Sequence, residues 1–411
     1  MTLKFKWETE FKQTEIGEIP REWEEKRVEE FYKLMYGITT SSKGYGNCRL
    51  LRMTDIGEED INIETIPYAK IDEQELKKYY LDEDDLVISR IANVGAIGHI
   101  RGDLLQKLDK PLIFGSYLLK FVKQPGKQIS NRFVYYFFIS HPMQTFIESL
   151  AEGSTRPNTN AKVVSKFPLY YPPPPEQSSI ATVLSWFDDL IENKKRQNEI
   201  LEKVAMAIFK SWFVDFEPFK DEEFVHNEEL GKEIPEGWKI EKLKELTENI
   251  TSGRGRYIIK AKEGRYPLWG ANGILGFINE YDLEGFAILT GRVGTLGKVF
   301  LVNDKFTISD NVLTLIPKKT IYIFFIYLCM KTQIDFESLN VGSTQPLITK
   351  TALGDENVIL PPQPILQHFH SLVEPLFQKI TLNQKQIMVL RKIRDALLPK
   401  LVFGRLRVEE I

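Results

Sequence analysis

The sequence has few of the residues that hold metals or form disulfide frameworks. It contains two cysteines, Cys48 and Cys329, and five scattered histidines among 411 residues. Two cysteines cannot build a disulfide framework or a cysteine-rich zinc site. His368 and His370 are two residues apart, so on a helix their side chains would point in different directions. We therefore expect no metal in this chain.

Long apolar runs are also lacking. The longest candidate, IYIFFIYLCM (Ile321 to Met330), is too short to cross a bilayer. The first residues, MTLKFKWETEFKQTE, include no apolar stretch of signal-peptide length. We expect a cytoplasmic protein with no membrane association.

Signatures of catalysis are absent as well. The sequence has no G-x-S-x-G, no HExxH and no Asn/Asp-Pro-Pro-aromatic tetrapeptide of amino-methyltransferases. GRVGTLGKV (Gly291 to Val299) resembles a phosphate-binding P-loop, but Arg292 stands where the first glycine belongs and Val299 replaces the magnesium-binding hydroxyl. The related first-half stretch has His99 in place of the lysine. We expect a binding or scaffolding protein with no catalytic residue and no cofactor of its own.

Charge is distributed unevenly along the chain. The net charge of −3 argues mildly against a dedicated nucleic-acid binder, which is usually basic. From Ile250 to Lys331, however, there are eleven Lys/Arg and six Asp/Glu, whereas Asp215 to Glu233 holds eight acidic residues and two lysines. A basic module beside an acidic connector remains compatible with DNA binding.

Three short sequence motifs, which we call words, occur twice in the same order. EIPREW (Glu18) returns as EIPEGW (Glu233), VGAIG (Val94) as VGTLG (Val293), and GSTRP (Gly153) as GSTQP (Gly342). The offset falls from 215 to 199 to 189 and then stays constant. Each half therefore has a part of variable length before the GST word, which we call its front, and a part of fixed length after it, which we call its back. The first front is about 26 residues longer than the second.

Each fixed back predicts a long helix. A proline cluster follows each GST word, and the next segment carries apolar residues at alternating spacings of three and four, which is typical of a heptad seam. The seam positions in the first half, and in the second half 189 residues later, are Ile180, Val183, Phe187, Leu190, Lys194, Gln197, Leu201, Val204 and Ile208, then Phe369, Leu372, Leu376, Lys379, Asn383, Gln386, Leu390, Ile393 and Leu397. We expect helices of about 30–35 residues, ~50 Å long, with Pro375 and Pro399 as the only breaks in the second.

Both predicted seams become polar at the same place. If the helices pair antiparallel, Lys194, Gln197, Asn383 and Gln386 would meet in one central layer that fixes register at a cost in stability. The alternative is a solvated gap in two unrelated helices.

The two fronts read as mixed α/β domains. Short apolar runs such as DLVISRI, PLIFGSYLLKFV, FAILT, KVFLV and NVLTLIP predict strands. A helix is predicted before each GST word, over 131–150 and 320–339. Trp23 and Trp238 are expected to be buried anchors.

Several loop side chains could contact DNA. Arg pairs with guanine and Gln with adenine in the major groove, and both also bind phosphate. Glycine turns beside arginines bring backbone amides near a phosphate or base edge. The candidates are Arg90, Asn93, Ser154, Thr155, Arg156, Arg254, Arg256, Arg292, Ser343, Thr344 and Gln345. For each of them the alternative is an ordinary solvated turn.

The whole pattern resembles the specificity subunit of type I restriction-modification systems. Two EIPxxW starts, two variable fronts, two GST words and two heptad helices occur in the order typical of that family, over nearly the whole chain. LRMTDI (Leu51 to Ile56) is similar to a segment of its target recognition domains, and YPLWGANGILGFI (Tyr266 to Ile278) is similar to another variant.

The resemblance implies an α+β fold with two mixed α/β target recognition domains in pseudo-two-fold repeat, separated by two long antiparallel coiled-coil helices. The expected boundaries are 1–172 for the first recognition domain, 173–216 for the first spacer helix, 217–360 for the acidic connector and second recognition domain, and 361–411 for the second helix and tail.

It further implies a non-catalytic reader of double-stranded DNA. The helices would dock methyltransferase subunits, usually two, and a restriction and translocase subunit would complete the complex. S-adenosylmethionine, ATP and Mg would be held by those partners, with none in this chain. Because the fronts differ, the target should be bipartite and asymmetric, with half-site centres about one turn, ~10 bp, apart.

Two other functions remain open from the residues alone. One is a coiled-coil scaffold that binds only proteins, against which the basic second front counts. The other is a stand-alone DNA methyltransferase or nuclease with an unrecognised site.

Overall fold

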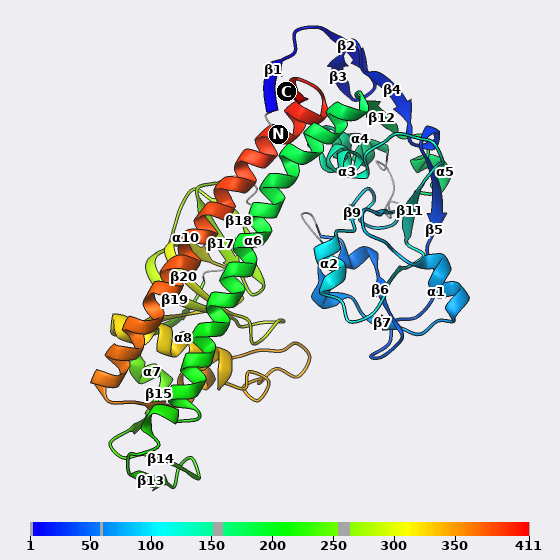
Figure 1. Cartoon of the computed structure of the whole chain (residues 1–411). Helices are drawn as coiled ribbons and strands as arrows, with labels where there is room; N and C mark the ends of the chain where they lie inside the picture. The colour runs from blue at the N-terminus through cyan, green and yellow to red at the C-terminus, as the bar shows by residue number, and fades with distance from the viewer. Residues whose placement is uncertain (1–2, 58–60, 151–158, 254–263, 411) are drawn as a thin grey trace. The chain divides into compact units, whose positions relative to one another are not determined.

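Two helices of 40 residues each run through the fold, α6 (Pro174–Phe213) and α10 (Gln363–Val402) (Figure 1). Their first residues and their last residues both lie 189 positions apart, the offset that separates the GST words. Both are longer than the predicted length of about 30–35 residues, and α10 continues through Pro375 and Pro399, where the sequence predicts breaks. An interior proline costs a helix about 3 kcal/mol, and the apolar burial of Val373, Phe377, Leu398 and Leu401 offsets that loss.

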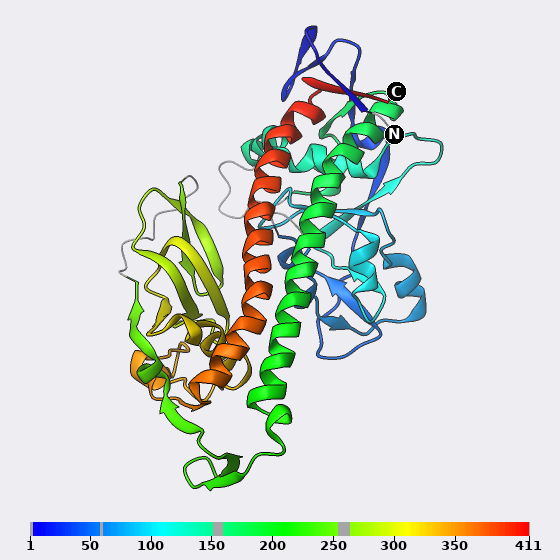
Figure 2. The same ribbon diagram turned by 60° about the vertical axis from the view of Figure 1, so that its left-hand side comes forward.

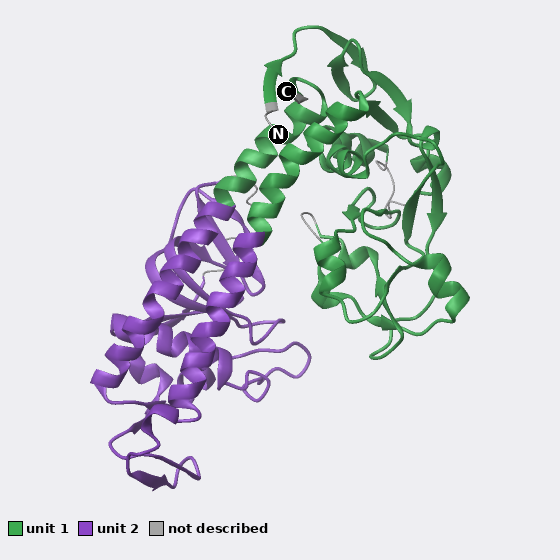
Figure 3. Ribbon diagram, in the orientation of Figure 1, with its two compact units in different colours: residues 1–192, 388–411 green, residues 193–387 purple. Residues whose placement is uncertain are grey.

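The computed structural model describes residues 3–57, 61–150, 159–253 and 264–410. It divides into two units, which Figure 3 colours separately. Unit 1 comprises residues 1–192 and 388–411, and unit 2 comprises residues 193–387. Each unit therefore contains part of α6 and part of α10, which lie side by side in Figures 1 and 2.

Unit 1 combines several small sheets with short helices. A four-stranded antiparallel sheet has the order β5-β11-β8-β9, and a three-stranded sheet has the order β10-β6-β7. Two-stranded pairs join β2 to β3, β4 to β12, and β1 near the N-terminus to β23 near the C-terminus. The strands are β1 (Leu3–Trp7), β2 (Phe11–Thr14), β3 (Gly17–Pro20), β4 (Glu24–Arg27), β5 (Tyr32–Tyr36), β6 (Cys48–Leu51), β7 (Tyr68–Ala69), β8 (Leu86–Ser89), β9 (Ile97–His99), β10 (Leu112–Phe114), β11 (Leu118–Lys123), β12 (Pro168–Tyr171) and β23 (Leu406–Glu410). The short helices are α1 (Glu73–Tyr79), α2 (Gly102–Gln106), α3 (Asn131–Ile139), α4 (His141–Leu150) and α5 (Ala161–Val164).

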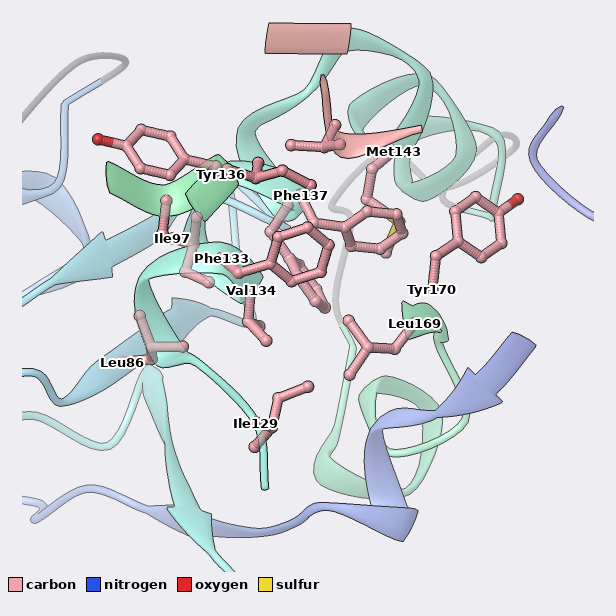
Figure 4. Packing of buried hydrophobic residues seen from close by; sticks show 14 of the residues in the cluster. Leu86, Ile97, Ile129, Phe133, Val134, Tyr136, Phe137, Met143, Leu169 and Tyr170 are labelled. Carbon is pink, nitrogen blue, oxygen red and sulfur yellow. The ribbon is translucent and has the colours of Figure 1, made fainter. Parts of the chain in front are cut away.

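The core of unit 1 is rich in aromatic rings. Phe133 and Phe137 of α3 pack with Tyr170 of β12 and with residues of the long helices (Figure 4). Tyr136 lies at the edge of this cluster and points its hydroxyl away from Phe137. Trp23 is fully buried, as the sequence predicts.

Unit 2 is built on one six-stranded sheet with the order β16-β21-β19-β20-β17-β18. Helix α8 packs on it, and Phe324 and Phe325 share one cluster with Ile288 of the sheet and Phe369 of α10. Trp238 is 6% exposed, which confirms the second predicted anchor. The strands are β13 (Phe224–Asn227), β14 (Lys232–Pro235), β15 (Lys239–Lys242), β16 (Thr247–Ser252), β17 (Tyr266–Gly270), β18 (Gly273–Ile278), β19 (Leu283–Gly291), β20 (Val299–Ile308), β21 (Val312–Pro317) and β22 (Asn357–Leu360), and the helices are α7 (Leu243–Leu246), α8 (Ile323–Thr332) and α9 (Lys350–Gly354).

The mixed helix and sheet content confirms the predicted α+β class, but two helix predictions are wrong in extent. The predicted helix over 131–150 is two helices, because Ser140 has an extended backbone that ends α3, and α4 starts anew with Pro142 in its first turn, where proline is tolerated. The one predicted over 320–339 is helical only as a 3₁₀ turn, Thr320–Tyr322, and α8.

The predicted heptad seam is also wrong at several positions. Leu190, Val204, Leu372 and Ile393 are 42–50% exposed, whereas the neighbouring Ile191, Ala205 and Val373 are buried. The helices bury a face against their own unit as well as against each other. In unit 2, for example, Phe213 contacts both Phe369 of α10 and Phe325 of α8, with ring centroids 4.8 and 5.2 Å away. A prediction that treats the two helices as an isolated pair therefore places the buried residues at the wrong positions.

A largely buried histidine, His370, should make unit 2 sensitive to acid. Burial between α10 and α8 lowers the pKa of His370 below its usual value of about 6.5, although Glu374 opposes this shift. The native state then binds fewer protons than the unfolded state, so stability is lost as the pH falls through 6.5. We expect His370→Phe to weaken the pH dependence of unfolding between pH 7 and 5. Chemical denaturation across that range measures it, with exposed His368→Phe as the control; identical slopes for all three proteins would contradict it.

Candidate nucleic-acid interface

The glycine-rich turn between β19 and β20 is the centre of the candidate interface in unit 2. Gly294 and Gly297 have φ angles of 81° and 78°, a conformation that favours glycine. The backbone N–H of Arg292 donates to the carbonyl of Asn311 over 2.8 Å, which fixes the start of the turn. The stretch that resembles a P-loop in sequence is thus a tight connection between two antiparallel strands.

The second GST word lies against this turn. Val293 forms a β-bridge with Leu347, and Gly294 N–H donates to the Pro346 carbonyl over 3.0 Å. An ideal Cβ on Gly294 would lie 3.8 Å from Nε2 of Gln345. The fold therefore brings Arg292 and Gln345 together from positions more than 50 residues apart.

The GST turn is held by its own asparagine. The Oδ1 of Asn340 accepts 2.9 Å hydrogen bonds from the backbone N–H groups of Gly342 and Leu347. Ser343, Thr344 and Gln345 are exposed between these two anchors. Their side chains are thus presented to solvent on a pinned backbone.

A third turn, between β17 and β18, joins this group. The Nδ2 of Asn272 donates to the Thr295 hydroxyl over 3.1 Å. A Cβ on Gly291 would lie only 3.2 Å from Cβ of Ala271 and 2.1 Å from the Thr295 carbonyl oxygen, so the turns pack without space for a side chain. Sequence reasoning missed Asn272, although Asn-Gly between two short apolar runs is a strong hairpin signal.

In unit 1 the corresponding arginine follows β8. Arg90 N–H donates to the Tyr117 carbonyl over 3.1 Å, and the Arg90 carbonyl accepts from Thr159 N–H over 2.8 Å. Its Nε donates to the Ser116 carbonyl, and its guanidinium lies 5.7 Å from the ring centre of Tyr117. Asn93 is exposed in the next turn.

The two arginines occupy matching backbone positions in their units. The Arg292 carbonyl accepts from Ile348 N–H over 2.9 Å, and Ile348 is 189 residues after Thr159. Their side chains differ, because Arg90 Nε is bonded internally whereas Arg292 Nε is buried and has no partner within the described residues. Five further candidates, Ser154, Thr155, Arg156, Arg254 and Arg256, lie outside the described residues.

The predicted polar layer on the helices is brought together only in part. Asn383 is fully buried, and its Nδ2 donates to Gln197 Oε1 over 3.3 Å and to Asn198 Oδ1 over 2.9 Å. The sequence pattern did not identify Asn198, which is the nearer partner. Gln386 Oε1 is buried without a partner in the part of the chain described, and no hydrogen bond joins Lys194 to Asn383.

The described residues contain few groups that could hold a metal or act as a thiol nucleophile. They include no group of three or more His, Cys, Asp or Glu side chains that could hold a metal ion. Burial raises the pKa of the Cys329 thiol to about 12 and also raises that of Cys48, so neither is a ready nucleophile at neutral pH. Within the same residues, no helix has the length and apolar character needed to cross a membrane.

Each unit presents an arginine turn beside a strand end and an exposed amide side chain, and in unit 2 exposed hydroxyl groups lie on a pinned loop. These features define a modular protein suited to nucleic-acid contact. A family model described as "Type I restriction modification DNA specificity domain" matches residues 20–203 and 235–392. The chain belongs to this family, and its role is DNA recognition as the specificity subunit of a type I restriction-modification system.

Individual relatives agree with this assignment. The type I restriction enzyme MjaIX specificity subunit of Methanocaldococcus jannaschii is 36% identical, over 100% of this chain and 99% of its own. The putative MjaX specificity subunit of the same organism is 25% identical over 99% of both chains. The crystal structure of a type I restriction-modification S subunit from M. genitalium matches with a TM-score of 0.54 and 21% identity, covering 92% of this chain and 96% of that one, which supports the fold.

Proposed function

We propose that this chain reads an asymmetric, bipartite DNA sequence, with one half-site for each recognition domain. The observation that carries the proposal is a matching backbone hydrogen bond in each unit: the carbonyls of Arg90 and Arg292 accept hydrogen bonds from residues 189 positions apart. We call these two hydrogen-bonded turns the backbone frames. The frames agree, but the turns on them, residues 90–96 and 292–298, carry different side chains. Related frames with unlike loops suit the reading of two unlike half-sites.

The two long helices are proposed to act as an antiparallel coiled-coil spacer between recognition domains related by a pseudo-two-fold repeat. Equal lengths and a constant 189-residue offset support this reading. In unit 2, the bond from Asn383 near the middle of α10 to Asn198 near the middle of α6 suits a register-fixing layer. The corresponding boundaries are residues 1–172, 173–216, 217–360 and 361–411.

Methyltransferase subunits are proposed to dock on the exposed apolar faces of the helices. In unit 1, Trp186 and Leu190 of α6 are 46% and 50% exposed; in unit 2, Ile200 and Val204 are 52% and 43% exposed. Each unit carries further exposed apolar residues on α10, namely Met388, Val389 and Ile393 in unit 1 and Leu372 and Leu382 in unit 2. Grouped exposed apolar side chains mark interaction surfaces, and two such faces suit two methyltransferase subunits.

The chemistry of the complex is assigned to the partners. On this proposal the chain itself is non-catalytic, and S-adenosylmethionine, ATP and Mg belong to the methyltransferase and restriction subunits. DNA affinity would be shared among subunits, in keeping with the near-neutral charge of this chain. The complex is expected to act in the cytoplasm.

A map of methylated adenines in the host genome, with and without this gene, tests the proposal. We expect a two-part, non-palindromic motif that disappears when the gene is deleted. A continuous or palindromic motif would refute the bipartite reading.

Co-purification tests the docking faces separately. Leu190→Asp in unit 1 and Val204→Asp in unit 2 should each reduce the bound methyltransferase from two copies to one, because a buried carboxylate at an apolar interface is strongly unfavourable. Glu199→Gln, an exposed polar change on α6, should leave both copies bound. Full binding by both aspartate variants would place the docking surface elsewhere.

A further inference from the structure

The turn between β17 and β18 carries a side chain whose hydrogen-bonding capacity matches adenine. Asn272 is exposed, and one of its two amide N–H groups is used by the Thr295 hydroxyl. The remaining N–H and the Oδ1 are one donor and one acceptor on the same planar group. Adenine presents the complementary pair in the major groove, the N7 acceptor and the N6 amino donor.

Thr295 gives this amide a fixed orientation. Thr295 belongs to the turn that begins at Arg292, and that turn is tied to the GST loop by the Gly294 N–H to Pro346 hydrogen bond. An amide that is already held loses less conformational entropy on binding than a free one. The Asn272 side chain is thus held at a surface that also presents Gln345, the second amide side chain beside the same turn.

We propose that Asn272 is a specificity-determining residue that contacts an adenine base in the half-site read by unit 2, and that Thr295 is the residue that positions it. Gln345, whose Nε2 lies beside Gly294 of the same 292–298 turn, is the neighbouring amide side chain. This inference rests on the DNA-reading role of unit 2 and adds the residue and the class of base to it.

The test uses the complete chain assembled with its methyltransferase subunits. Binding is measured by competition between duplexes that carry the wild-type target or a single changed base pair. Asn272 does not have a left-handed backbone conformation, so alanine fits the turn. We expect Asn272→Ala to lose about tenfold or more of the preference for adenine at one position of one half-site, with the other half-site unchanged.

Two further changes separate base reading from structural damage. Asn272→Asp replaces the donor with an acceptor, so the preference at that position should move toward cytosine, whose amino group a carboxylate accepts. Thr295→Val should weaken the same single preference, and Thr295→Ser should restore it. Asn303→Ala, an exposed asparagine on β20 of the same unit, should change nothing.

The outcomes distinguish this inference from the broader proposal. If the target is bipartite but Asn272→Ala and Asn272→Asp retain every base preference, Asn272 does not read a base. A uniform loss of affinity across all duplexes would also overturn the inference, because it would indicate a phosphate contact. A target that is not bipartite in the wild-type complex would instead refute the proposed arrangement of half-sites.

Discussion

Replacing Asp188 by alanine is expected to destabilise unit 1 by about 3–5 kcal/mol, the usual cost of breaking a buried ion pair. Asp188 of α6 accepts a hydrogen bond from the Tyr136 hydroxyl over 2.5 Å and one from Arg394 Nη1 of α10 over 2.8 Å. The side chains of Asp188 and Arg394 are only 17% and 12% exposed, and Tyr136 is 2% exposed. One carboxylate therefore accepts hydrogen bonds from Tyr136 of α3 and from Arg394 of α10.

The alanine variant would leave the Tyr136 hydroxyl without its acceptor and Arg394 with only Asp395, whose side chain is 59% exposed. Burial alone would lower the pKa of Arg394, but its hydrogen bonds and charge interactions with Asp188, and also with Asp395, raise it. For a unit of this size a loss of 3–5 kcal/mol corresponds to roughly 6–20 °C in Tm. Calorimetry of the chain measures the loss, with Asp189→Asn as an exposed neighbouring control.

A paired substitution tests the cause. Asp188→Leu combined with Arg394→Leu removes both charges, and replacing a buried pair with apolar groups is often close to neutral. We expect the double variant to regain most of the lost stability. A double variant as unstable as the single one would show that packing at these positions, and not the unpaired charge, is responsible.

The duplicated words and the helix periodicity predicted the broad organisation of the chain, because both are local or repeat along the sequence. The constant 189-residue offset placed both long helices, and the EIPxxW words placed Trp23 and Trp238 in the cores. The exact buried face of the helices was not predictable, because it depends on what else packs on them. Phe213, for example, is buried by α8 as well as by α10.

Individual residues of the candidate interface could be predicted from the sequence, but their proximity in space could not. Arg292 and Gln345 belong to recognisable turn words, yet only the pairing of Val293 with Leu347 shows that they lie together. Asn272 was missed because its partner, Thr295, is 23 residues away on another turn. Ion pairs between distant residues gave no sequence signal for the same reason.

Arg407 forms a second buried ion pair, in addition to that of Asp188 with Arg394. We expect Arg407→Met to lower the free energy of unfolding of unit 1 by about 3–5 kcal/mol at pH 7. The guanidinium makes a bidentate contact with Glu176, through Nε at 2.5 Å and Nη2 at 2.7 Å, and also bonds Glu8 over 2.8 Å and Glu22 over 2.6 Å. Arg407, Glu176 and Glu8 are 13%, 9% and 17% exposed at the side chain. One residue of β23 thus joins the start of α6 to the segment after β1.

Acid should reduce the destabilisation caused by Arg407→Met. A loss of packing alone would not depend on pH. In the wild type the pKa of Glu8 is lowered, first by the backbone N–H groups of Glu10 and Thr9 and further by Arg407, so its stabilising contribution is lost as the pH falls. Without Arg407, three neighbouring carboxylates repel one another, and protonation relieves the repulsion. We therefore expect the difference between wild type and Arg407→Met to be largest at pH 7 and to shrink toward pH 4. Urea denaturation at both pH values measures it; Arg405→Met, an exposed arginine two residues earlier, is the matched control, and a difference independent of pH would assign the effect to lost packing against Trp23.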